Sequence, residues 1–203
     1  METNSKQEPA EYYDEIYKDN EYYARSGEDA GHKRIWDNII ADLSKDIHAS
    51  NRRIIELGCG TGQLAELLLP MEEFGFAYLL GIDFSTVAID IARSRFKDTY
   101  INSRFVVGNL FDCEQMYRDL KPDTVIATEV FEHIKEDKKL LGMFSSGTEF
   151  YITVPDFGGR SHVRFFENEK QVRAHYSDAL DIREVVEFKS KNHTIFLIKG
   201  KIK

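Results

Sequence analysis

The chain has 203 residues, a length that suits one domain with one sizeable hydrophobic core. Its net charge of −8 argues against a nucleic-acid substrate, because an acidic protein has no general attraction for phosphate backbones. Its two cysteines, Cys59 and Cys113, form no Cys-x-x-Cys pair, which argues against a disulfide scaffold or a zinc knuckle. The sequence shows no signal peptide and no apolar run long enough to cross a bilayer, so we expect a cytoplasmic protein.

Residues 1–50 are predicted to form a helical N-terminal extension. Within residues 10–25, tyrosines and an isoleucine recur at steps of three and four, which indicates an aromatic helix face with a break near Asp19-Asn20. A second amphipathic helix is expected over His32–Leu43.

From Arg52 onward, short apolar segments alternate with amphipathic ones. The predicted strands are Ile54–Leu57, Ala77–Asp83, Arg104–Val107, Thr124–Thr128 and Glu149–Val154. The predicted helices are Gln63–Leu69, Thr86–Phe96, Glu114–Asp119 and Asp137–Phe144. This alternation is typical of a parallel sheet with helices on both faces.

The C-terminal end follows a different pattern. Asp181–Phe188 and Thr194–Ile202 are predicted to be two strands of a hairpin, so the last strand should run antiparallel at or near a sheet edge. We therefore predict a single domain over residues 1–203. It is a doubly wound α/β fold with a mostly parallel seven-stranded sheet, and residues 51–203 form its Rossmann-like core.

A glycine-rich turn joins the first predicted strand to a helix. Glycines allow positive φ angles and let a ligand approach the backbone closely. The dinucleotide fingerprint Gly-x-Gly-x-x-Gly fails here, because the glycines fall at 58, 60 and 62 and position 63 is Gln63. A nicotinamide oxidoreductase is therefore disfavoured.

The run Glu56-Leu57-Gly58-Cys59-Gly60-Thr61-Gly62 resembles the first motif of class I S-adenosylmethionine-dependent methyltransferases. The resemblance implies that the turn, Cys59 included, flanks the methionine half of the cofactor, with Glu56 near its amino group. It also implies that Asp83 binds the ribose, with Ser85 taking the helix cap, and that Phe84 lies beside the adenine. Asn109 and Leu110 resemble the family's adenine-binding turn. The resemblance covers about residues 53–155.

The run Glu129-Val130-Phe131-Glu132-His133 resembles the fourth motif of the same family. The resemblance places Glu129 on the methionine side of the cofactor, where a carboxylate would favour the sulfonium charge. A hydroxyl acceptor needs a base or a metal. The unperturbed pKa of a histidine side chain suits a general base at neutral pH, and His133 is the histidine of this motif. We therefore name His133 and Glu132 as candidate catalytic residues. The alternative, that both pack or cap the following helix, stays open.

The acceptor side has further candidates. Glu129, Glu132, His133 and His162 also resemble the metal ligands of methyltransferases that modify the 3′ end of small RNAs. In the wider family the residues before the first motif form a lid, so Tyr13, Tyr17 and Tyr23 are candidate substrate contacts, together with His162 and Arg164. The competing interpretation is that the tyrosine helix merely packs on the sheet.

These observations predict methyl transfer to an oxygen or nitrogen atom of a small molecule. A metal-assisted RNA methyltransferase and a non-catalytic cofactor-binding module remain alternatives; a divalent metal is possible but not favoured. The sequence identifies neither the acceptor nor the oligomeric state, and it predicts no membrane partner.

Overall fold

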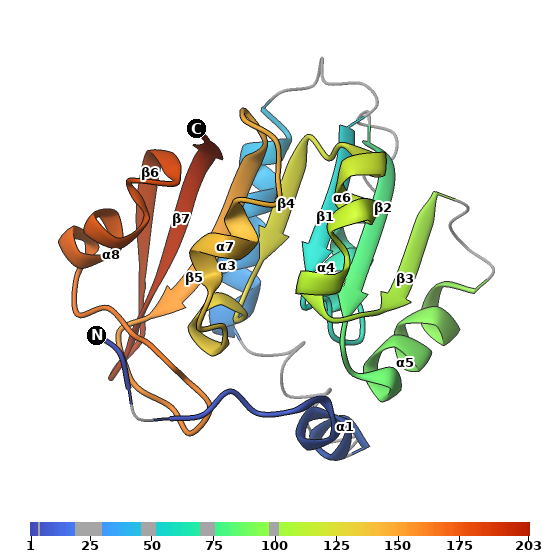
Figure 1. The fold of residues 1–203 in the computed structure, drawn as a ribbon, viewed down its shortest axis with the longest axis horizontal. Helices are drawn as coiled ribbons and strands as arrows, with labels where there is room; N and C mark the ends of the chain where they lie inside the picture. The colour runs from blue at the N-terminus through green and yellow to red at the C-terminus, as the bar shows by residue number, and fades with distance from the viewer. Residues whose placement is uncertain (4, 19–29, 46–51, 70–75, 98–101) are drawn as a thin grey trace. The chain divides into compact units, whose positions relative to one another are not determined.

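The computed structural model describes residues 1–3, 5–18, 30–45, 52–69, 76–97 and 102–203 (Figure 1). These residues fall into two compact units. The glycine-loop unit comprises residues 9–113, and the hairpin unit comprises residues 1–8 and 114–203. The seven strands have the order β3-β2-β1-β4-β5-β7-β6.

The glycine-loop unit contains three parallel strands. They are β1 (Arg52–Leu57), β2 (Phe76–Asp83) and β3 (Ser103–Val107). Its helices are α1 (Ala10–Lys18), α3 (Ala30–Leu43), α4 (Gln63–Leu68), α5 (Thr86–Phe96) and the short 3-10 helix η2 (Leu110–Asp112). Because the strands are parallel, the turns that follow β1, β2 and β3 lie at the same edge.

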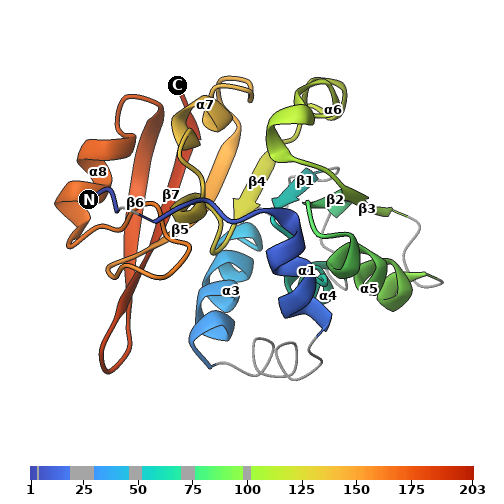
Figure 2. The same cartoon turned by 60° about the horizontal axis from the view of Figure 1, so that its bottom comes forward.

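Helix α5 shows how the sequence fixes these elements. The hydroxyl of Ser85 accepts a hydrogen bond from the backbone N–H of Ala88 and caps the helix. The apolar residues Ala88, Ile89, Ala92 and Phe96 recur at helical spacing and are buried. Figure 2 shows α1 near α5, against which it packs.

The hairpin unit contains the remaining four strands. Strands β4 (Thr124–Ala127) and β5 (Glu149–Pro155) are parallel, and β7 (Thr194–Ile202) runs antiparallel to both β5 and β6 (Leu180–Lys189). Its helices are α6 (Glu114–Leu120), η3 (Phe131–His133), α7 (Asp137–Leu141) and α8 (Glu169–Tyr176).

The seven strands, the terminal hairpin and the antiparallel last strand confirm the predicted fold class. Helix α8 was not predicted, although Asn168 caps it and its buried residues Val172 and Tyr176 lie four apart. The predicted helix over residues 10–25 is described only to Lys18, and its remainder lies outside the described residues. Within the described part of the chain, no helix is both long and apolar enough to span a membrane.

Candidate active site

The turn after β1 has the backbone that its glycines allow. Gly58, Gly60 and Gly62 have φ angles of 65°, 52° and 81°, in the left-handed region that disfavours residues with a Cβ atom. The backbone N–H groups of Gly58 and Cys59 both donate to the carbonyl of Ile82, at 2.8 and 3.1 Å. The turn is therefore anchored to the end of β2 before it enters α4.

Asp83 ends β2 and holds the turn from its other side. One carboxylate oxygen accepts the N–H of Gly60 at 3.0 Å, and the other accepts the N–H of Ser85 at 2.9 Å. Burial raises the pKa of Asp83 to about 6, and these two hydrogen bonds oppose the rise. The sequence predicts that Ser85 takes the helix cap and that Asp83 binds the ribose. Ser85 does cap α5, but both Asp83 oxygens are engaged with the backbone.

Glu56 is the second-to-last residue of β1, and its side chain is buried. Its Oε2 atom has no hydrogen-bond partner among the described residues. Burial raises the pKa of Glu56 to about 8, and the negative charge of Asp83 adds to the effect. A buried acceptor without a partner suits a ligand that brings a donor or a positive charge.

Helix α1 lies against the same turns. The hydroxyl of Tyr17 lies 3.1 Å from the position that a Cβ atom on Gly60 would occupy, and the ring of Tyr13 lies 5.1 Å from that of Phe84. Asp14 accepts hydrogen bonds from the Ser85 hydroxyl at 2.5 Å and from the N–H of Val87 at 3.3 Å. Of the three predicted tyrosines, Tyr17 therefore lies at the glycine turn and Tyr13 lies beside Phe84 after β2, whereas Tyr23 falls outside the described residues.

The turn after β3 carries Asn109 and Leu110. The Asn109 side chain accepts the N–H of Phe111 at 3.0 Å and so caps η2, which begins at Leu110. The N–H of Gly108 donates to the carbonyl of Asp83 at 2.9 Å, which joins this turn to the end of β2. All predicted cofactor residues except Glu129 therefore belong to one unit.

In the hairpin unit, Glu129 follows β4 with a φ angle of 57°, an unusual conformation for a residue with a side chain. Its N–H donates to the hydroxyl oxygen of Thr153 at 2.8 Å, and that hydroxyl donates to the Glu129 carboxylate at 3.1 Å. Thr153, which no sequence motif marks, thus holds both the backbone and the side chain of Glu129.

Glu132 is fully buried, and neither carboxyl oxygen has a hydrogen-bond partner among the described residues. Burial, followed by the negative charge of Glu129, raises the pKa of Glu132 well above its ordinary range. The Nε2 atom of His133 lies 3.9 Å from Glu132 Oε1. Burial lowers the pKa of His133 to about 4, so its ring is neutral at neutral pH.

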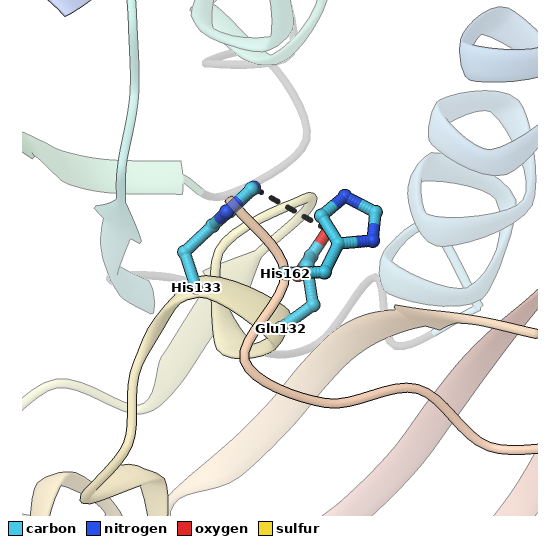
Figure 3. A group of neighbouring side chains, drawn as sticks. All are labelled: Glu132, His133 and His162. Atoms are coloured by element: carbon cyan, nitrogen blue, oxygen red, sulfur yellow. Dashed lines mark ion pairs between the residues drawn. The ribbon is translucent and has the colours of Figure 1, made fainter. Parts of the chain in front are cut away.

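His162 lies beside this pair (Figure 3). The Nδ1 atom of His133 lies 3.0 Å from the carbonyl of Ser161, and that of His162 lies 3.1 Å from the carbonyl of Phe157. Because a carbonyl oxygen only accepts, each Nδ1 carries a proton, and the neutral His133 ring keeps its lone pair on Nε2. One ligand atom from each of Glu132, His133 and His162 lies within 4.8 Å of the others.

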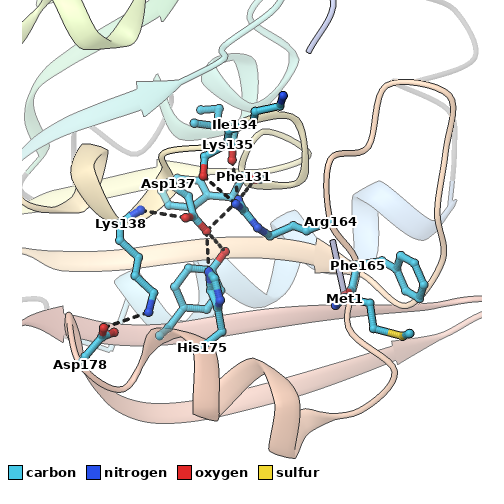
Figure 4. A network of polar contacts seen from close by, with 11 residues as sticks. Met1, Phe131, Ile134, Lys135, Asp137, Lys138, Arg164, Phe165, His175 and Asp178 are labelled. Atoms are coloured by element: carbon cyan, nitrogen blue, oxygen red, sulfur yellow. Dashed lines mark hydrogen bonds and ion pairs between the residues drawn. The ribbon is translucent and has the colours of Figure 1, made fainter. Parts of the chain in front are cut away.

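Arg164, predicted as a substrate contact, is buried and engaged by the protein itself. Its guanidinium is buried, and it forms an ion pair with Asp137 at 2.8 Å (Figure 4). It also donates to the carbonyls of Phe131, Ile134 and Lys135. The interpretation of Arg164 as a substrate contact is replaced by a structural one: it fixes the segment that carries Glu132 and His133.

This chain is similar to known methyltransferases. A methyltransferase-domain family model matches residues 48–193. A ubiquinone biosynthesis O-methyltransferase from Pelagibacter ubique is 33% identical over 118 residues, which cover 53% of this chain and 46% of that protein. The chain thus spans about half the length of this curated relative.

Two solved structures share the fold. Magnesium protoporphyrin IX methyltransferase from Synechocystis PCC 6803, with bound S-adenosylmethionine, has a TM-score of 0.71 and 18% identity, over 99% of this chain and 100% of that one. N-methyltransferase NodS from Bradyrhizobium japonicum WM9, with S-adenosylhomocysteine, has a TM-score of 0.73 and 16% identity, over 96% and 99%. The family model covers most of the chain and includes both the glycine turn and the Glu132–His133 segment. The chain belongs to the class I, S-adenosylmethionine-dependent methyltransferases.

Proposed function

We propose that this protein transfers the methyl group of S-adenosylmethionine to an oxygen or nitrogen atom of a small-molecule acceptor. The observation that carries the proposal is the turn of three positive-φ glycines, closed by the Asp83 carboxylate on the N–H of Gly60. Support for the acceptor atoms comes from the relatives, one named an O-methyltransferase and one an N-methyltransferase. The net charge of −8 also favours a small molecule over RNA.

The proposed cofactor roles follow the chain. Gly58, Cys59, Gly60 and Gly62 would lie along the methionine half, and the buried Glu56 would receive its amino group. Each Asp83 oxygen retains a second lone pair with which to accept a ribose hydroxyl. Phe84, Asn109 and Leu110 would lie at the adenine, and Tyr13 and Tyr17 would line the acceptor side. The predicted role of Glu129 is to stabilise the positive charge of the cofactor sulfonium, and this role stays a prediction.

Cofactor binding is expected to release a proton. Glu56 has a pKa of about 8 in the free protein, so its carboxyl is mostly protonated at pH 7. The positive amino group of S-adenosylhomocysteine favours the ionised carboxylate and lowers that pKa, so up to about one proton leaves on binding. Calorimetry at pH 7 in buffers of different ionisation enthalpy measures this number directly, and the affinity should rise with pH between 6 and 8.

The control for proton release is Glu56→Gln, which keeps the size of the side chain but cannot ionise. It should bind the ligand more weakly and lose most of the buffer dependence. Proton uptake by the wild-type protein, or an equal proton release by Glu56→Gln, would contradict the assigned role of Glu56.

At the acceptor, we propose that His133 Nε2 takes the proton of the nucleophile as that atom bonds the methyl carbon and the carbon–sulfur bond of the cofactor breaks. Glu132 would assist from beside the His133 ring, and His162 would position the acceptor. The neutral His133 ring carries its lone pair on Nε2, beside the buried carboxyl of Glu132. Methyl transfer itself needs alignment of the acceptor atom, methyl carbon and sulfur, so positioning supplies much of the catalysis.

A screen of hydroxyl and amine acceptors with methyl-labelled S-adenosylmethionine tests the activity. We expect labelled product with at least one acceptor and none when His133→Ala and Glu132→Gln are combined. Binding of S-adenosylhomocysteine without transfer to any acceptor would instead favour a non-catalytic cofactor-binding module.

A second proposal concerns a divalent metal at Glu132, His133 and His162. The residues fit such an ion in two ways. Each histidine already donates its Nδ1–H to a backbone carbonyl, as metal-bound histidines do, and the buried Glu132 carboxyl has no hydrogen-bond partner among the described residues. Two imidazoles and a carboxylate suit a first-row transition metal better than magnesium. Such an ion would supply Lewis acidity to an acceptor hydroxyl.

Gly159 provides a test of the metal proposal. A Cβ atom on Gly159 would lie 2.9 Å from the Cδ2 and Nε2 atoms of His162, so Gly159→Ala should displace that ring. A Cβ atom on Gly158 would meet its nearest neighbour at 3.6 Å, an ordinary contact, which makes Gly158→Ala the matched control. In spectroscopic titrations with Co²⁺, Gly159→Ala should weaken binding by about 10-fold or more. Absence of Co²⁺ binding by the wild-type protein, or equal binding by both variants, would remove the metal.

A further inference from the structure

The first residues of the chain lie along the segment that carries His162. Glu2 forms an antiparallel bridge with Arg164, the N–H of Thr3 donates to the carbonyl of Val163 at 2.9 Å, and the N–H of Phe165 donates to the carbonyl of Met1 at 3.0 Å. Figure 4 shows Met1 beside Phe165. Residues 1–3 therefore pair with residues 163–165 like a short strand, inside the hairpin unit.

Two hydroxyl groups of this N-terminal segment reach the backbone around His162 itself. The Thr3 hydroxyl donates to the carbonyl of His162, and the Ser5 hydroxyl donates to the carbonyl of Gly159 at 3.3 Å. The N–H of Ser5 donates to the Thr3 hydroxyl oxygen at 3.1 Å, so the two residues act as one unit. The turn they hold is closed by the N–H of His162, which donates to the carbonyl of Gly159 at 3.2 Å.

The position of the His162 ring depends on this turn. The ring packs on Gly159, where even a methyl group would overlap it, and its Nδ1 atom bonds the carbonyl of Phe157. Its centroid lies 5.0 Å from that of His133. A shift of the Gly159 or His162 backbone would therefore move the ring relative to both Phe157 and His133.

We propose that Thr3 and Ser5 are positioning residues that hold the His162 imidazole in the orientation needed at the acceptor. This rests on the proposed function, because it takes His162 to be an acceptor-side residue. Neither residue belongs to the methyltransferase motifs, and both lie outside the part of the chain that the family model matches. Positioning groups of this kind matter because a site loses activity when its side chains move by about 1 Å.

The test compares three forms of the full chain: wild type, Thr3→Val, which keeps the side-chain shape but loses the hydroxyl, and Thr3→Ser, which restores it. Protein labelled with ¹⁵N-histidine is studied by long-range ¹H–¹⁵N NMR, with His162→Gln to assign the ring. We expect two well-separated His162 nitrogen signals in the wild type and in Thr3→Ser, as a fixed Nδ1–H tautomer requires. In Thr3→Val their separation should shrink as the ring leaves the Phe157 carbonyl.

His175 provides the internal control, because its Nε2 atom lies 2.9 Å from the Asp137 carboxylate, whereas the Thr3 and Ser5 hydroxyls bond the backbone of His162 and Gly159. Its signals should stay unchanged, a result that general destabilisation would not give. If Thr3→Val does not fold, Ser5→Ala should show the same change at smaller size. Unchanged His162 signals in the folded variants, or failure of Thr3→Ser to restore them, would overturn the proposal. S-adenosylhomocysteine binding is measured in parallel, so that loss of the proposed function is seen separately.

Discussion

Gly60→Arg is expected to weaken S-adenosylhomocysteine binding by at least about 100-fold, which corresponds to about 2.7 kcal/mol. Gly60 has a φ angle of 52°, and a Cβ atom there would point toward the hydroxyl of Tyr17 at 3.1 Å. An arginine side chain must occupy the space above the turn, where the methionine half of the cofactor is proposed to lie. Calorimetry on the purified variant, with its circular dichroism spectrum compared to the wild type, measures both binding and fold.

Gly147→Arg is the matched control for backbone strain. Gly147 also has a positive φ angle, 83°, but lies in the hairpin unit with nothing within 4 Å of its Cβ position. Because both positions have positive φ angles, Gly147→Arg should lower the free energy of unfolding by about as much as Gly60→Arg does. It should keep the wild-type affinity for S-adenosylhomocysteine. Equal affinities for Gly60→Arg and Gly147→Arg would show that the turn does not hold the cofactor.

Arg164→Met is expected to lower the free energy of unfolding by about 3–5 kcal/mol, the usual result of removing one partner of a buried ion pair. The substitution leaves the Asp137 carboxylate buried without its cation, although His175 and Tyr176 still donate to it. It also removes the donors to three backbone carbonyls between Phe131 and Lys135. Denaturant unfolding measures the loss.

Arg160→Met provides the comparison for Arg164→Met. Arg160 belongs to the same segment, but its side chain is 78% exposed and its contact with Glu8 is long, at 3.8 Å. Exposed pairs of this kind contribute about 0–1 kcal/mol. A stability loss of the same size in both variants would mean that the buried network around Asp137 is not the source.

The strands could be predicted because buried parallel strands are short apolar runs, as Ile54–Leu57 shows. The true start of β1 at Arg52 was not visible, because Arg52 and Arg53 join the sheet through backbone pairing with β2. Helix α8 was not predicted because most of its residues are polar. Only Val172 and Tyr176 are buried, and two apolar residues are too few to form a helical pattern.

The site was predictable where local sequence dictates geometry. The glycines at 58, 60 and 62 imply positive φ angles, and all three have them. The engagement of Asp83 with Gly60 could not be foreseen, because these residues meet only when β1 and β2 pair. Arg164 looked like a surface cation for the same reason: its partner Asp137 lies 27 positions earlier, and no local pattern links the two.

The contribution of the N-terminal segment is also non-local. Thr3 and Ser5 are small polar residues in a polar stretch, and no sequence pattern connects them to Gly159 or His162. Only the pairing of residues 1–3 with residues 163–165 brings them to this turn. The sequence therefore indicated the glycine turn, whereas the contacts that hold His133 and His162 became visible only in the folded chain.

We propose that the glycine turn and Asp83 together bind S-adenosylmethionine. Calorimetric titration of the wild-type protein with S-adenosylhomocysteine tests it most directly. We predict saturable binding of one molecule per chain, weakened when the pH falls below 6, where Asp83 and Glu56 are both protonated. The absence of any binding heat at neutral pH, together with no thermal stabilisation of the protein by the ligand, would show that the glycine turn is not a cofactor site.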